Sequence, residues 1–114
     1  MDEKDLIRLR HMQDAIHTAS RFIEGVNRED LTPDSMLVLA LTRAIEIIGE
    51  AASRVSKETR ESLPQIPWAQ IVGMRNRLIH AYFDVNLDRL WDTAVVSLPA
   101  LAEQLETIIP SDEE

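Results

Sequence analysis

The residues most able to do chemistry gather in one short stretch, Met74 to Asp84, which reads MRNRLIHAYFD. If this stretch is helical, successive side chains turn by about 100°. One polar stripe then holds Gly73, Asn76, Arg77, His80 and Asp84. Arg75 falls instead in the middle of the apolar arc. A guanidinium there is costly unless it meets a counter-charge or reaches a polar cleft, so Arg75 is the residue least explained by packing.

A lone histidine is most often structural, but the neighbours of His80 favour a functional role. Asn76 and Asp84 lie one helical turn to either side of it, and Arg77 lies just before it. Donors and a carboxylate therefore surround one imidazole. Gly73 on the same stripe costs a helix roughly 1 kcal/mol relative to alanine, which indicates that another group approaches closely there.

This set of side chains suits metal-free cleavage of RNA. A base activates the 2′-hydroxyl, an acid protonates the leaving oxygen, and cations stabilise the crowded phosphate. One histidine cannot easily act as acid and base in the same step. We therefore expect a two-fold dimer that brings two copies of the helix, each with its His80, into one cleft.

Other chemistries find no support in the sequence. The chain has no cysteine, no HExxH pattern and no His/Asp cluster, so we expect no metal site and no cofactor. Motifs for phosphate-binding loops and serine nucleophiles are also missing. Glu46, Glu50, Asp84 and His80 could assemble in space, although their spacing does not require it.

The charge distribution bears on the ligand. A net charge of −8 taken alone speaks against a nucleic-acid binder. However, residues 54–80 carry +3, whereas residues 1–53 carry −4 and residues 81–114 carry −7. A local cationic site can bind RNA phosphate while the acidic remainder discourages non-specific coating of nucleic acid, and we expect no DNA ligand. Ordinary surface charge is the alternative interpretation.

Apolar residues spaced three and four apart predict four long helices in an antiparallel up-and-down bundle. The first three cover about residues 6–26, 32–55 and 68–83, with a short helical turn at 57–63 that would form a possible fifth helix. The last runs from about 86 to 108. No segment has the alternation of a strand, so we expect an all-α fold.

Particular residues should mark the helix ends. Thr32, followed by proline, is expected to cap the second helix, and Pro67 is expected to open the third. Asn86 should cap the last helix, and Pro99 should kink it because its ring removes one amide donor. The first helix should end near Gly25.

We expect a single domain over residues 1–110, followed by an acidic disordered tail at 111–114. The chain has no run of apolar residues long enough to span a membrane and no secretory leader. A cytoplasmic location and no membrane partner are therefore expected.

The arrangement Arg75-x₄-His80 resembles the Rx₄₋₆H motif of the HEPN superfamily, and its extension to Tyr82 resembles the HepT branch. The flanking text is similar too, in AIEIIGEAA at 44–52, in Ile66-Pro67-Trp68 and in Gly73-Met74-Arg75-Asn76. The resemblance covers essentially residues 4–109.

The resemblance implies a homodimeric helical bundle whose two motifs face a shared cleft. It implies a metal-independent ribonuclease toxin of a type VII-like toxin–antitoxin system, with Arg75 and His80 catalytic. Asn76 and Arg77 take supporting roles. It further implies a cognate minimal nucleotidyltransferase as antitoxin, which neutralises the toxin by transferring AMP to Tyr82.

Two other interpretations stay open. The chain could be a catalytically silent HEPN module that binds a nucleotidyltransferase, or a plain structural bundle. The motif favours the enzyme, because an adaptor has no need for Arg75 inside an apolar arc.

Overall fold

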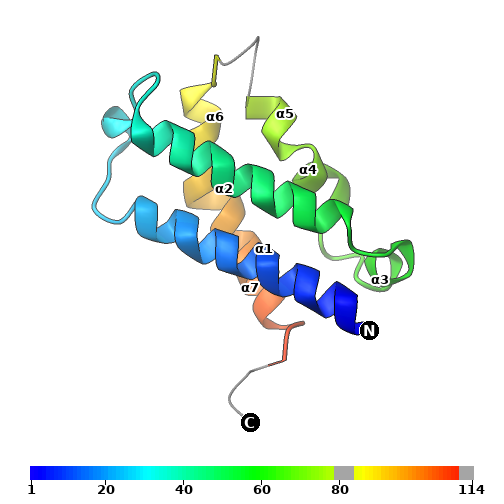
Figure 1. The fold of residues 1–114 in the computed structure, drawn as a ribbon. Coiled ribbons are helices and arrows are strands. Elements are labelled where there is room, and N and C mark those ends of the chain that lie inside the picture. Colours follow the sequence, from blue (N-terminus) through cyan, green and yellow to red (C-terminus); the bar gives the residue numbers. More distant parts are fainter. Residues whose placement is uncertain (79–83, 111–114) are drawn as a thin grey trace.

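The chain folds into an all-α bundle (Figure 1). The computed structural model describes residues 1–78 and 84–110, and within these it contains no strand and no helix long and apolar enough to cross a membrane. The predicted all-α bundle is confirmed, and the predicted dimer stays a prediction. The predicted tail at 111–114 lies outside the described residues.

The elements are α1 (Glu3–Phe22), the 3-10 turn η1 (Arg28–Asp30), α2 (Met36–Ser53), α3 (Lys57–Ser62), α4 (Trp68–Val72), α5 (Met74–Leu78), α6 (Leu87–Asp92), the π-helical segment η2 (Thr93–Ser97) and α7 (Leu98–Glu106).

The two long helices α1 and α2 lie side by side and run in opposite directions (Figure 1). The last helix packs across both, since α6 contacts α2 and α7 contacts α1. Each fully buried large apolar side chain contributes about 1.5–3 kcal/mol to stability. The fully buried side chains of this core include Leu9, Met12, Leu41, Ile45, Ile48, Ile66, Leu78, Leu90 and Leu105.

The start of α2 differs from the prediction, because Ser35 and not Thr32 is its N-cap. The Ser35 hydroxyl accepts a hydrogen bond from the Val38 amide at 3.2 Å, and the helix begins at Met36. Asp34 has a φ of 62°, a left-handed conformation that no helix starting at Pro33 could continue through. The first helix also ends earlier than predicted, at Phe22.

The third predicted helix is interrupted. Helix α4 begins directly after Pro67, as predicted, but Gly73 is its C-cap and separates it from α5. The remaining part of the predicted helix, residues 79–83, lies outside the described residues. The start of the last helix is joined to the end of α5 by a hydrogen bond, which the Asn86 amide donates to the Leu78 carbonyl at 2.6 Å.

Helices α2 and α4 approach closely at Gly49. A Cβ at this position would lie 3.3 Å from the carbonyl oxygen of Ile71 and 3.5 Å from that of Val72. Glycine permits this approach because it has no side chain. The close packing brings the face of α2 that carries Glu46 next to α5, which also contacts α2.

The last helix runs through α6, η2 and α7. Asn86 caps it as predicted, since its side chain accepts from the Arg89 amide at 3.1 Å. In η2 the Leu98 amide donates to the Thr93 carbonyl, five residues back, which widens the turn. Pro99 follows at once and can neither donate a hydrogen bond nor fit a regular turn. The predicted distortion at Pro99 is therefore present as a π-helical turn.

Helix α3 confirms the predicted short helical turn, and Asp5 of α1 anchors it. The Asp5 carboxylate is 4% exposed. It accepts hydrogen bonds from the Ser56 hydroxyl at 2.6 Å, the Thr59 hydroxyl at 2.5 Å and the Ser56 amide at 2.9 Å. These bonds, with the charge of Arg8, hold the pKa of Asp5 below its ordinary value of 3.8.

Candidate functional site

Arg75 meets a counter-charge on the neighbouring long helix. Its Nε donates to Oε2 of Glu46 at 2.5 Å, and the two side chains are 47% and 25% exposed. The expectation that Arg75 needs a counter-charge or a polar cleft is met by Glu46. Because both side chains stay accessible, the pair joins α2 to α5 at the protein surface and not in the core.

The geometry of this pair leaves the outer edge of the guanidinium available. Only Nε of Arg75 bonds to Glu46, and in the part of the chain that the structure describes its two terminal nitrogens have no hydrogen bond. These nitrogens form a fork that matches two oxygens of a phosphate. Arg75 is thus held by one edge and presents the other.

A second arginine on α2 extends the charged network. Arg43 Nη1 lies 4.0 Å from Oε1 of Glu46 and 3.5 Å from Oε1 of Glu50. Glu46 therefore stands between two guanidinium groups, whereas Glu50 pairs with Arg43 alone among the described residues. Of the acidic residues whose role the sequence left open, Glu46 contacts Arg75 of the motif.

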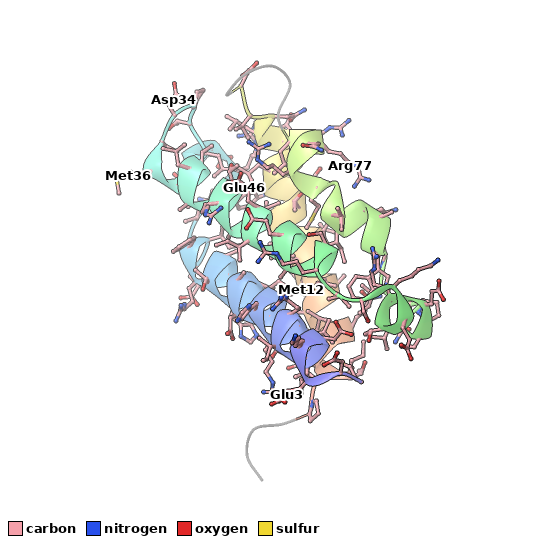
Figure 2. All side chains as sticks on the ribbon, turned by 45° about the vertical axis from the view of Figure 1, so that its right-hand side comes forward. Glu3, Met12, Asp34, Met36, Glu46 and Arg77 are labelled. Atoms are coloured by element: carbon pink, nitrogen blue, oxygen red, sulfur yellow. The ribbon has the colours of Figure 1, made fainter. Side chains whose placement is uncertain are left out.

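Arg77 does not join this network, and it lies apart from Glu46 (Figure 2). Its Nη1 donates to the Gln70 carbonyl at 3.0 Å. A Cβ on Gly73 would lie 3.5 Å from its Nη2, so the guanidinium folds back over that glycine. The closest approach at Gly73 is made by the Ala69 carbonyl oxygen, which would lie 3.3 Å from such a Cβ.

Arg77 also lines a pocket of about 500 Å³ between α4–α5 and the last helix. Sequence reasoning missed this pocket. Two features of the sequence could have indicated it: Pro99, whose ring distorts a helix, and Arg89, the only lysine or arginine after position 77. Both features come from segments that are distant in sequence, so only the fold brings them to Arg77.

The structure describes only some of the remaining predicted site residues. Asn76 and Asp84 are exposed. His80 and Tyr82 lie outside the described residues. The structure thus brings Arg75 to Glu46, whereas Arg77 lies against Gln70 and the pocket. Within residues 1–78 and 84–110, no three His, Cys, Asp or Glu side chains lie close enough together to hold a metal ion.

Comparison with known proteins shows the family to which the chain belongs. Residues 12–108 match the family described as Ribonuclease HepT-like. A protein of Caldanaerobacter subterraneus subsp. tengcongensis is 40% identical over 79% of this chain and 80% of its own length. A protein of Methanocaldococcus jannaschii is 35% identical over 93% of this chain and 88% of its own length.

A third relative, from Thermococcus cleftensis, is 35% identical over 88% of this chain and 91% of its own length. All three carry provisional ribonuclease assignments in their names, and the Thermococcus protein is named as a ribonuclease HepT. No solved structure gives a significant match. The matches cover the bundle from α1 to the end of the last helix, and the chain belongs to the HepT-like ribonuclease family of the HEPN superfamily.

Proposed function

We propose that this chain is a metal-independent endoribonuclease that cleaves RNA as a homodimer, with Arg75 and His80 as its catalytic residues. One observation carries the proposal beyond family membership. Arg75 is fixed through Nε by Glu46, and its free terminal nitrogens are accessible. A packing residue would be buried, whereas an arginine held in this way is prepared to bind a phosphate.

The proposed reaction uses the 2′-hydroxyl of the RNA as its nucleophile. One His80 takes the 2′-hydroxyl proton, and the oxygen attacks the adjacent phosphorus. The bond from phosphorus to the 5′-oxygen breaks, and His80 of the partner subunit gives that oxygen a proton. Arg75 stabilises the negative charge on the phosphate oxygens, and Asn76 supports it with a hydrogen bond. The products are a 2′,3′-cyclic phosphate and a 5′-hydroxyl.

Total RNA incubated with the protein in EDTA tests this activity. We expect cleavage by the wild-type protein and a loss of at least 100-fold in Arg75→Ala and in His80→Ala. Arg75→Ala should keep its helicity and thermal stability because Arg75 is exposed, and we expect the same of His80→Ala. Full activity of His80→Ala would refute the mechanism. Absence of cleavage by the wild type would favour a silent module that binds a nucleotidyltransferase.

We further propose that the chain is the toxin of a toxin–antitoxin pair and that a nucleotidyltransferase silences it at Tyr82. The Tyr82 oxygen would attack the α-phosphorus of ATP, with pyrophosphate as the leaving group. Tyr82 lies seven residues after Arg75 on the motif segment. A bulky nucleotide with a negative phosphate there would compete with RNA for the arginines, by charge and by volume.

Intact mass measured after incubation with the partner nucleotidyltransferase, ATP and Mg²⁺ tests this regulation. The wild-type protein should gain mass in multiples of AMP and lose ribonuclease activity. Tyr82→Phe should gain no mass and stay active in the same mixture, because the phenol takes no part in proton transfer. Equal labelling of both proteins would move the acceptor to another residue.

A further inference from the structure

The pocket of about 500 Å³ beside Arg77 takes no part in the reaction described above. Its walls come from α4 and α5 on one side and from the last helix on the other. A volume of this size lies within the range of pockets that hold small molecules, roughly 300–1,000 Å³. Its apolar lining includes Ile71, Met74, Leu78, Leu98 and Leu101.

The charged residues of the pocket favour an anionic ligand. Arg77 and Arg89 line it together with a single acid, Asp92. Arg77 bonds to a neutral carbonyl, which leaves its charge uncompensated. The Arg89 guanidinium has no hydrogen bond or ion pair within the described residues. In a chain with a net charge of −8, two arginines without an ion pair at one pocket favour an anionic ligand over a cationic one.

The last helix departs from regular α-helical geometry where it borders this pocket. The wide turn of η2 contributes Thr93, Val96 and Ser97 to the lining. Turns of this π-helical type are frequent at functional sites because they alter which side chains a helix presents.

We propose that this pocket holds one nucleotide of single-stranded RNA close to the scissile phosphate, an inference that rests on the proposed ribonuclease function. The base lies on the apolar lining, and the phosphate of the same nucleotide binds Arg77 and Arg89. Arg75 and Arg77 both belong to α5, with Arg75 towards α2 and Arg77 towards the pocket, so a strand that reaches both must pass along this short helix. Paired bases cannot reach such a lining, and the pocket therefore selects unpaired RNA.

Binding of a fluorescent single-stranded RNA to His80→Ala protein tests the pocket without interference from cleavage. Adding Arg89→Gln should weaken binding about tenfold and should reduce the slope of log K against log salt by about 0.7, the value for one phosphate contact on a single strand. Ala100→Phe adds a ring at an exposed lining position of the pocket and should weaken binding without changing the salt slope. Arg21→Gln, an exposed arginine that does not line the pocket, should bind as the parent protein does.

The outcomes separate this inference from the proposed function. Unchanged RNA affinity in both Arg89→Gln and Ala100→Phe would overturn the pocket assignment, even if the wild type cleaves RNA. The reverse result, weakened binding in both variants with no cleavage by the wild type, would support the pocket and refute the ribonuclease. A change of oligomeric state in these variants with unchanged RNA affinity would make the pocket a protein interface and overturn the assignment.

Discussion

At the scale of single residues, the pairing of Arg75 with Glu46 explains how a cation can be kept in a fixed position and still serve a substrate. A flexible surface arginine would lose conformational freedom on binding phosphate. The bond between Nε and Oε2 at 2.5 Å removes part of that cost before the substrate arrives. Glu46 is therefore interpreted as a positioning residue that acts through Arg75.

This interpretation predicts a graded response at Glu46. Glu46→Ala should lower kcat about tenfold or more with a smaller change in KM, because Arg75 would no longer be oriented. Glu46→Gln should recover much of this loss, since its amide oxygen can still accept from Nε. Steady-state cleavage of a defined RNA measures both values.

Glu50→Ala is the matched control for this series, because Glu50 lies on the same face of α2 but contacts only Arg43. It should stay close to the wild type. Equal losses in Glu46→Ala and Glu50→Ala would contradict a specific role for Glu46.

At the scale of elements, the sequence predicted most helices, because their apolar spacing reflects the core directly. The sequence also predicted three local features, because each depends on local backbone chemistry. These are the N-cap at Asn86, the start of α4 after Pro67 and the distortion of the last helix near Pro99. The sequence did not predict the start of α2. Thr32 followed by proline normally marks a helix N-terminus, but the left-handed conformation of Asp34 delays the helix to Met36.

The contacts of the site depend on the fold and were only partly predictable. The need of Arg75 for a partner followed from its place on the helix, but the identity of Glu46 required the approach of α2 to α4 and α5 at Gly49. In the same way, the anchoring of α3 joins Asp5 to Ser56 and Thr59 across half of the chain. No local pattern marks such a pairing.

The Asp5 anchor gives a prediction about stability. Asp5→Ala should lower the free energy of unfolding by about 2 kcal/mol at neutral pH, since hydrogen bonds to a charged group are among the stronger ones. Asp14→Ala, at an exposed position of the same helix, should change it little. Chemical denaturation at pH 7 measures both.

The sign of the pH dependence follows from the lowered pKa of Asp5. The stabilisation is fully present above the unfolded-state pKa, near 3.9, and is lost as pH falls through the lower folded-state value. The stability difference between wild type and Asp5→Ala should therefore be constant above about pH 5 and shrink below about pH 4. A difference that stays constant to pH 2 would contradict an ionised anchor.

At the scale of the whole molecule, an acidic chain must bring its few cations together to bind RNA. Arg75 faces α2 while Arg77 and Arg89 line the pocket on the last-helix side, so a bound strand would pass along α5 between them. One protomer supplies only one His80 to this path. The proposed chemistry, which uses one histidine as base and another as acid, would need a second copy.

We predict that the active species is a homodimer with a two-fold axis near the motif segments. Light scattering at assay concentration should give about twice the chain mass of 13.0 kDa. An excess of inactive His80→Ala protein mixed with the wild type should lower the activity below that of the same amount of wild type alone, because a mixed dimer holds only one His80. A fully active monomer would contradict this arrangement.

The chemical nature of the product ends shows whether cleavage proceeds through the 2′-hydroxyl without a metal. A short single-stranded RNA is cleaved in EDTA, and mass spectrometry identifies the new termini. We expect a 2′,3′-cyclic phosphate and a 5′-hydroxyl, and no cleavage when the nucleotide before the cleaved bond carries 2′-deoxyribose. A 5′-phosphate with a 3′-hydroxyl, or cleavage that EDTA abolishes, would contradict a metal-independent reaction through the 2′-hydroxyl.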